Sequence, residues 1–415
     1  MSHWIIAPVV LPAIAAALML LFLRHRLTLQ RATSILAVLA LNGIALALLH
    51  SAMTAGPEAY FLGDWPAPFG IVLVLDRLSA LMVALLAALA LPVTLYAIGS
   101  GADAKGAHFH PLLMFLLMGL GGAFLTGDAF NLFVFFEVLL IASYGLMVHG
   151  GGEARLRAGL QYVAFNLVAS ALFLFALGLL YAVTGTLNMA DLALKLPTLP
   201  EGDAALLRVA AVMLILVFAI KGALVPLHFW LPSTYANAPL VTAALFAIMT
   251  KLGAYATLRF TSLVFPPDLL ATDGIVATLL LPAALVTLAV GSIGTLGAAS
   301  LPRLAAYAGI ASMGTVFLGL AQMTPTATAA ALYYLLHSTL ATALMFLAAD
   351  LVSRRRVHLR LDLLAPVAQS GPVATLYLAA AIGLAGLPPL SGFLGKLLLL
   401  DAWRDHAAAI WPAVL

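Results

Sequence analysis

Long apolar runs, each about long enough to cross a lipid bilayer, follow one another along almost the whole chain. A bilayer-spanning helix needs about 20 predominantly apolar residues. Twelve runs of this kind fall at 4–23, 33–53, 72–99, 111–126, 130–149, 158–183, 205–225, 238–262, 274–297, 302–323, 327–352 and 372–400. A shorter run over 407–415 begins a thirteenth. We therefore expect an all-α polytopic membrane protein.

The composition excludes several classes of protein. Hydrophobic residues make up 64% of the chain and charged residues only 8%, whereas a soluble domain carries about 25% charged residues. The 19 Lys+Arg, against 16 Asp+Glu, are too sparse for a nucleic-acid surface. The lack of cysteine excludes disulfides and thiolate metal sites, and no nucleotide-binding or hydrolase motif is present. We expect no cofactor, no metal and no catalytic residue.

Basic residues indicate which way the chain crosses the membrane, because cytoplasmic loops are enriched in Lys and Arg. With the amino terminus outside, eleven basic residues fall in inside loops: Arg24, Arg26, Arg31, Lys105, Arg155, Arg157, Arg303, Arg354, Arg355, Arg356 and Arg360. Five fall in outside loops or at outside helix ends: Arg77, Lys195, Arg208, Arg259 and Arg404. We expect a multi-pass protein of the cell inner (plasma) membrane with its amino terminus outside.

Three lysines, Lys221, Lys251 and Lys396, lie inside predicted spans. A lysine at the centre of a spanning helix costs about 2.5–3.5 kcal/mol, so such residues usually face a protein interior or a water cavity. A lysine near a helix end can instead extend to the interface. Lys251 follows VTAALFAIMT and precedes LGAYATL, which puts it mid-span. Together the three lysines indicate a hydrated polar route.

Glu137, in NLFVFFEVLLIASYG, is the acidic residue well inside a span and is the natural counter-ion for a lysine. Desolvation raises the pKa of a carboxylate and lowers that of an ammonium, while mutual attraction does the reverse. Separating such a pair can therefore move a proton on or off the lysine. The alternative is a structural ion pair that fixes helix register.

Two histidines are further candidates. His337 is centred in the apolar run ALYYLLHSTLATALMF, and an ordinary pKa near 6.5 suits proton relay. A single buried histidine is more often simply hydrogen-bonded to a neighbour, but the buried lysines favour the relay. His228, in LVPLHFWLP, is an accessory candidate that could equally lie at the interface.

Two predicted spans contain helix-breaking residues beside a lysine. Pro226 follows Lys221, and Pro388 in GLPPLSGFLGK precedes Lys396. Proline removes a backbone donor, which a membrane helix tolerates only where protein or water satisfies the freed groups. Broken helices at corresponding places in two halves are typical of inverted repeats with an ion site near the midplane. Pro226 and Pro388 are therefore accessory candidates.

Several stretches resemble one known family in collinear order. They are FFEVLLIASYGLM, LQYVAFNLVASALFLFALGLLYAVTGTLN, KGALVPLHFWLPSTYANAPLVTAALFAIMTKLGAY, LPRLAAYAGIASMG, LLHSTLATALMF and GLPPLSGFLGK. They are similar to the proton-conducting antiporter-like subunits of complex I, membrane-bound hydrogenases and Mrp-type (Mnh or Pha) antiporters. The resemblance implies a fourteen-helix fold with two inverted five-helix repeats and broken helices seven and twelve. It also implies a proton path through Glu137, Lys221, Lys251, His337 and Lys396.

The resemblance divides the chain into helices 1–3 at 1–109, a first repeat of helices 4–8 at 110–265, and a second repeat of helices 9–13 at 266–415. Family members continue through helices thirteen and fourteen, so we expect the second repeat to be incomplete here. Within the family, the opening GDWPAPFGIVLVLDRLSALM is typical of the D subunit of Mrp-type antiporters. The implied function is proton translocation in a multisubunit Na⁺(K⁺)/H⁺ antiporter, with other antiporter subunits, lipid, protons and monovalent cations as partners.

Three alternatives stay open on the sequence alone. The first is a proton-pumping membrane subunit of NADH:quinone oxidoreductase or a hydrogenase, whose neighbouring genes would encode redox subunits. The second is a stand-alone solute carrier, which would need a dedicated polar cavity. The third is a scaffold with inert charges, in which neutralising Glu137 would leave transport intact.

Overall fold

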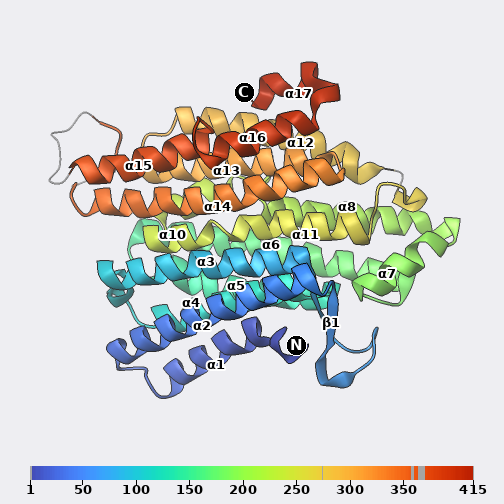
Figure 1. The fold of residues 1–415 in the computed structure, drawn as a ribbon, viewed down its shortest axis with the longest axis horizontal. Helices are drawn as coiled ribbons and strands as arrows, with labels where there is room; N and C mark the ends of the chain where they lie inside the picture. The colour runs from blue at the N-terminus through green and yellow to red at the C-terminus, as the bar shows by residue number, and fades with distance from the viewer. Residues whose placement is uncertain (1, 273, 357–358, 363–369, 415) are drawn as a thin grey trace. The chain divides into compact units, whose positions relative to one another are not determined.

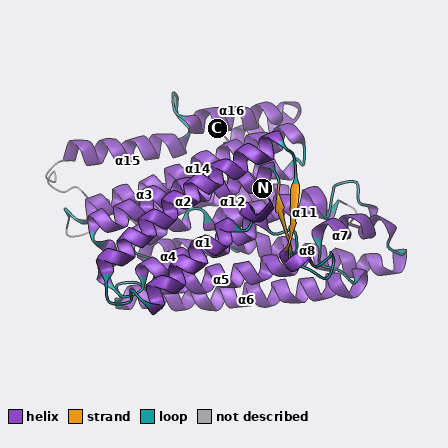
Figure 2. Ribbon diagram, turned by 60° about the horizontal axis from the view of Figure 1, so that its bottom comes forward, coloured by secondary structure: helices purple, strands orange, loops and turns teal. Residues whose placement is uncertain are grey.

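The computed structural model describes residues 2–272, 274–356, 359–362 and 370–414. The described chain is almost wholly helical, with one small pair of strands (Figure 2). Nine helical segments in this part are long and apolar enough to cross a membrane: α2 (Leu27–Thr54), α3 (Arg77–Ser100), α5 (Ala129–Met147), α6 (Glu153–Thr184), α8 (Ala204–Lys221), α10 (Leu240–Phe246) with α11 (Met249–Leu263), α12 (Ile275–Leu296), α13 (Leu301–Ala321) and α14 (Pro325–Ser353).

Shorter helices complete the predicted set of spans. α1 (Ala7–Leu21), α4 (Phe109–Leu125) and α15 (Ser370–Ala385) are apolar, and α16 (Ser391–Ala402) continues after α15. α7 (Met189–Lys195), α9 (Trp230–Asn237) and α17 (Ala407–Val414) are shorter still. Each of the twelve predicted runs contains at least one helix, and α17 occupies the predicted thirteenth run, whose last residue lies outside the described residues.

The third predicted span begins too early in the sequence-based interpretation. Residues Val72–Leu75 form strand β2, which pairs antiparallel with β1 (Glu58–Phe61). The helix α3 starts only after Asp76, whose carboxylate accepts a hydrogen bond from the Ser79 backbone N–H at 2.8 Å, while the Ser79 hydroxyl accepts from the Asp76 N–H at 2.8 Å. This reciprocal cap fixes the helix start, and an apolar run by itself cannot distinguish strand from helix.

The described chain forms two compact units, of which unit 1 comprises residues 1–217 and 263–272. Its first helices are drawn in blue to cyan in Figure 1. Within it α4 packs against α1, α3 and α5, while α2 packs on α1 and α3, and α6 packs on α5. Fourteen of the residues of α4 are buried, so this helix forms the core of unit 1.

Unit 2 comprises residues 218–262 and 273–415. Within it α14 packs against α10, α13, α15 and α16, and α13 also contacts α9 and α12. Glycines allow α12 and α13 to approach closely: a Cβ at Gly291 would lie 2.3 Å from the Ala311 backbone N, and one at Gly314 would lie 2.4 Å from the Leu288 N. Small residues serve this purpose at helix contacts in membranes.

Both predicted helix breaks are confirmed. α8 ends at Lys221 and α9 begins at Trp230, while α15 ends at Ala385 and α16 begins at Ser391. At the first break, the Val225 N–H donates to the Thr287 hydroxyl at 2.9 Å, and the Trp230 indole N–H donates to the Ile220 carbonyl at 3.1 Å. Side chains thus satisfy the backbone groups that the break releases. The division into inverted five-helix repeats stays a prediction.

Candidate functional site

Glu137 lies half-buried on α5 in unit 1. The helix starts at a buried cap, where the Asp128 carboxylate accepts from the Asn131 N–H at 2.7 Å. The Ser170 hydroxyl, on the neighbouring α6, donates a short hydrogen bond to Oε1 of Glu137. Ser170 is itself buried. This hydrogen bond fixes the orientation of the Glu137 carboxylate.

Lys221 is buried at the end of α8, in the part of the helix that belongs to unit 2. The next residue, Gly222, lies against α11: a Cβ on Gly253 would be 2.5 Å from the Gly222 N and 2.7 Å from the Phe218 carbonyl oxygen. These are backbone atoms, so only glycine fits at position 253. The contact places the lysine-bearing end of α8 directly on the helix that carries Lys251.

Lys251 is 1% exposed, near the start of α11. Its Nζ donates to the Ser312 hydroxyl of α13 over 3.4 Å, which is long for an N–H···O bond. That hydroxyl donates in turn to the Gly309 carbonyl at 2.7 Å. An ammonium has three N–H donors, and among the described residues of unit 2 the Ser312 hydroxyl is the one hydrogen-bond acceptor of Lys251.

His337 lies on α14 and is held at both ring nitrogens by the broken helix. Its Nε2 is 2.9 Å from the Gly383 carbonyl oxygen, and its Nδ1 is 2.7 Å from the Ser391 hydroxyl. A carbonyl only accepts, so Nε2 carries the proton and Nδ1 accepts from Ser391 in the neutral ring. A Cβ on Gly392 would lie 2.7 Å from Nε2, so glycine is needed for α16 to reach the ring.

Lys396 is half-buried on α16. Its Nζ donates to the Ala385 carbonyl at 3.1 Å and to the Val414 carbonyl at 3.5 Å. Ala385 ends α15, and the last carbonyls of a helix have no partner within it and attract cations. The break therefore supplies backbone acceptors to both Lys396 and His337.

The accessory candidates lie in the two breaks. Pro226 and His228 fall between α8 and α9, and Pro388 falls between α15 and α16. Among the residues that the structure describes, buried Nδ1 of His228 has no hydrogen-bond partner. The prediction of an accessory role for Pro226, His228 and Pro388 stays untested.

A second group of buried charges was not predicted from the sequence. Asp103, in the turn η3 (Ala102–Lys105) of unit 1, accepts two hydrogen bonds from Arg31, at 2.6 and 2.9 Å. It also lies 3.0 Å from Nε2 of the fully buried His110. Burial would raise the pKa of Asp103, but the hydrogen bonds and charges of Arg31 and His110 outweigh it and hold that pKa below its usual value.

A buried histidine joins the same turn. Nε2 of His149 lies 3.0 Å from the Ala102 carbonyl and donates to it, and the His149 carbonyl accepts from Arg155 at 2.7 Å. Burial lowers the pKa of His149, so its ring is neutral near pH 7. Side chains therefore tie the turn to α2, to α4 and to His149 in the segment that follows α5.

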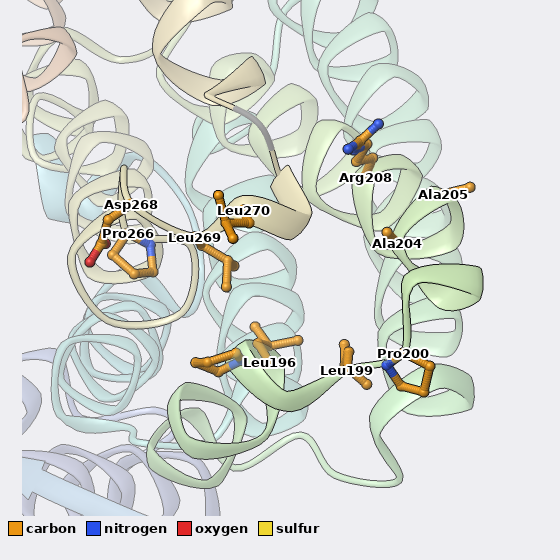
Figure 3. Close-up of a pocket in the computed structure, with 11 residues that line it drawn as sticks. Leu196, Leu199, Pro200, Ala204, Ala205, Arg208, Pro266, Asp268, Leu269 and Leu270 are labelled. Carbon is orange, nitrogen blue, oxygen red and sulfur yellow. The ribbon is translucent and has the colours of Figure 1, made fainter.

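An open cavity of about 650 Å³ lies in unit 1 (Figure 3). Its walls come from the segments around α7, the start of α8 and residues 266–270. The side chains of Arg208 and Asp268 lie on opposite sides of it (Figure 3). None of the five predicted proton-path residues lines this cavity, so the cavity is not part of the predicted proton path.

Sequence reasoning found the charged residues but missed most of their partners. The missed side chains are hydroxyls: Ser170 beside Glu137, Ser312 beside Lys251 and Ser391 beside His337. All three serines stand in stretches that carry the family resemblance, but only Ser391 also lies at a helix break that the residues themselves mark, in GLPPLSGFLGK. Serines are common in membrane helices, and so the other two carry no signal of their own.

Comparison with known proteins gives one consistent family. Residues 126–414 match the profile of the transmembrane part of the NADH:quinone oxidoreductase/Mrp antiporter family. The chain is 41% identical to the probable K⁺/H⁺ antiporter D subunit of Rhizobium meliloti, with 99% of this chain and 80% of that protein aligned. It is 40% identical to the Na⁺/H⁺ antiporter D subunit of Bacillus subtilis, with 95% of this chain and 80% of that protein aligned.

Solved structures that resemble this chain point to the same family. An Mrp complex from Dietzia sp. contains a chain with a TM-score of 0.91 and 30% identity, which covers 100% of this chain and 76% of that one. Respiratory complex I from Thermus thermophilus gives a TM-score of 0.82 at 30% identity, covering 99% of this chain and 85% of that one. The chain therefore belongs to the NADH:quinone oxidoreductase/Mrp antiporter family, as a multi-pass membrane relative of the D subunits of its cation/proton antiporters.

Proposed function

We propose that this chain is the proton-translocating membrane subunit of a multisubunit monovalent cation/proton antiporter, with the ion gradient as its driving force. The single observation that carries the proposal is the burial of Lys251 inside a membrane helix: it is 1% exposed, and its one hydrogen-bond acceptor among the described residues of unit 2 is a serine hydroxyl at 3.4 Å. Such a costly residue in a membrane helix is ordinarily functional. The names of the antiporter relatives supply the coupled ions, Na⁺ or K⁺.

The remaining predicted residues complete a proton path in this proposal. Lys251, His337 and Lys396 carry protons, and Glu137 modulates the charge on Lys221. Hydroxyl and carbonyl oxygens hold Glu137, His337 and Lys396 in defined orientations, which supports proton transfer because it needs positioned donors and acceptors. We also propose the two inverted repeats at 110–265 and 266–415 as the framework of the path.

A location and a set of partners belong to the same proposal. We propose a plasma-membrane protein with its amino terminus outside, assembled with other antiporter subunits in a lipid bilayer. The match to a chain of the Dietzia Mrp complex supports such an assembly. The chain acts as a transporter subunit in this proposal and not as an enzyme.

A redox-linked role is the second candidate, because the chain matches complex I and the Mrp complex at the same 30% identity. In a complex I or hydrogenase, remote electron transfer would drive the same proton route. Neighbouring genes distinguish the two: small antiporter subunits favour the first role, and iron–sulfur, flavin or nickel subunits favour the second.

The direct test expresses the native operon in antiporter-deficient cells and measures dequenching of a pH dye in everted vesicles on addition of Na⁺ or K⁺. We expect a cation-driven signal that Glu137→Gln and Lys221→Ala abolish in assembled complexes. The matched control is Glu153→Gln, because Glu153 is exposed at the first residue of α6. A native operon without any cation-driven signal would contradict antiport and favour the redox-linked complex.

A further inference from the structure

A small cavity lies beside Lys251 inside unit 2. Its volume is about 10 Å³, and it is lined by residues of α9, α11, α13 and α14 that include Tyr235, Lys251, Gly309 and Thr342. A single water needs about 10–15 Å³ and two to four polar partners. The cavity therefore has room for one water molecule and no larger ligand.

Thr342 gives this cavity a polar wall. Its side chain is 2% exposed, and among the described residues its hydroxyl has no hydrogen-bond partner. Its neighbour on the same helix, Thr339, is also buried but donates to the Leu335 carbonyl at 2.7 Å. A buried polar group without a partner is destabilising, so the Thr342 hydroxyl needs a ligand that the described part of the chain does not supply.

Lys251, which lines the same cavity, needs a hydrogen-bond acceptor there. Its ammonium has three donors, and the contact to Ser312, at 3.4 Å, occupies one of them weakly. Ser312 already donates its own hydroxyl proton to the Gly309 carbonyl. An oxygen placed in the cavity would accept from Lys251 and reach Thr342 at once.

We propose that this cavity is a binding site for one ordered water, which accepts a hydrogen bond from Lys251 Nζ and donates one to the Thr342 hydroxyl. Thr342 is then a positioning residue: it holds the water that stabilises the protonated lysine. The site also links α11 to α14, the helix that carries His337. This inference rests on the proposed proton-translocating function and adds to it a ligand and a residue.

Several other titratable groups on the surrounding elements are hydrogen-bonded to neighbours. Tyr235 on α9 donates to the Phe246 carbonyl at 2.8 Å, and His337 on α14 is held by Gly383 and Ser391. On α11, Arg259 donates to the Tyr255 hydroxyl at 3.1 Å. The other titratable residues on the elements around Lys251 are Tyr307 and Arg303 on α13, Tyr333, Tyr334 and Asp350 on α14, and Lys221 at the end of α8.

Two variants remove the water in different ways. Thr342→Val keeps the shape of the side chain and deletes the hydroxyl. Gly309→Ala adds a methyl whose nearest atom would be Thr342 Cγ2, at 3.7 Å, an ordinary contact. Alanine favours the helix more than glycine does, so we expect the variant to fold and assemble. The matched control is Thr339→Val, which removes a hydroxyl already satisfied within its helix.

The experiment measures cation-driven proton movement against pH for each assembled complex. Loss of the water disfavours protonated Lys251, so Thr342→Val and Gly309→Ala should move the alkaline limb of the profile to lower pH by about one unit and slow transport about 3- to 10-fold. Thr339→Val should leave the profile in place. Profiles of Thr342→Val and Gly309→Ala that coincide with that of Thr339→Val would overturn the proposal.

A map of the assembled complex, at a resolution that shows other buried waters, gives a readout independent of transport. We expect one density peak within hydrogen-bond distance of Lys251 Nζ and the Thr342 hydroxyl, and no peak in Gly309→Ala. If the native complex shows no cation-driven transport, the proposed function fails and the map still decides the water site. A native map without the peak contradicts the site whatever the transport assay gives.

Discussion

Two buried charges in this molecule are stabilised in opposite ways. Asp103 receives two hydrogen bonds from Arg31 and lies 3.0 Å from His110, so its charge is matched by partners with good geometry. Among the described residues of its unit, Lys251 has one hydrogen-bond partner, the Ser312 hydroxyl at 3.4 Å. A fully partnered charge resists any change of protonation state, whereas a weakly partnered one is suited to gain and lose a proton. The difference separates a structural anchor from a transport residue.

The largest expected effect is at the helix contact beside the lysines. Gly253→Ala would place a Cβ 2.5 Å from the Gly222 N, and the helices must move apart at a cost of about 1–3 kcal/mol. We expect cation-driven proton movement per assembled complex to fall to background, because Lys221 and Lys251 sit on the displaced segments. Fluorescence-detected gel filtration normalises the assembled amount.

Gly178→Ala on α6 is the control for this substitution, since no atom lies within 4 Å of the added Cβ. Equal transport by Gly178→Ala and Gly253→Ala would show that the contact between α8 and α11 does not matter for proton movement.

A substitution at Asp103, the structural anchor, should reduce stability and leave transport intact, the opposite of what we expect at the lysines. Asp103→Asn removes the negative charge between Arg31 and His110, and hydrogen bonds to charged groups contribute about 1.5–3 kcal/mol. We expect a lower melting temperature and less assembled protein, with unchanged transport per assembled complex. Transport that falls further than assembly does would remove the distinction between anchor and transport residue.

Glu137 is an intermediate case, with one hydroxyl partner on α6. Ser170→Ala deletes that donor and leaves the carboxylate free to rotate, so the rate of cation-driven proton movement per assembled complex should fall about 3- to 10-fold, the worth of one hydrogen bond. Ser170→Thr should restore the rate. Ser143→Ala is the control, because that buried serine contacts the Tyr162 hydroxyl at 2.9 Å and not Glu137; the same fall in rate in both alanine variants would refute a specific role for Ser170.

The smallest effect concerns acid stability. The pKa of Asp103 is lower in the folded protein than its usual value, so its stabilising contribution is complete above about pH 4, the unfolded value, and is lost as the pH falls through the folded pKa. The melting temperature of the native complex should decline below about pH 4 more steeply than that of Asp103→Asn. Parallel declines would mean that the carboxylate adds nothing to acid stability.

The sequence predicted the residues whose presence in a membrane is costly. Lys251 and Lys396 are conspicuous because a charge in lipid is unfavourable, and Pro226 and Pro388 because they interrupt helices. These residues and the apolar runs were enough to predict the helices and both breaks.

What the sequence could not predict depends on how helices face one another. The contact of Ser170 with Glu137 follows from the rotation of α6 on α5, and serine is too common to signal it. Asp103 lies in a connection where a carboxylate is ordinary, so nothing marked its pairing with Arg31. The strand at Val72–Leu75 reads as part of an apolar run until its partner strand is known.

The central claim is that weakly partnered Lys251 carries protons whereas fully partnered Asp103 supports the fold. The most direct test compares Lys251→Ala with Asp103→Asn in everted vesicles, as the rate of Na⁺- or K⁺-driven proton movement per assembled complex, with Lys105→Ala at an exposed lysine as control. The account predicts background rates for Lys251→Ala and native rates for the other two. Native rates for assembled Lys251→Ala would contradict it.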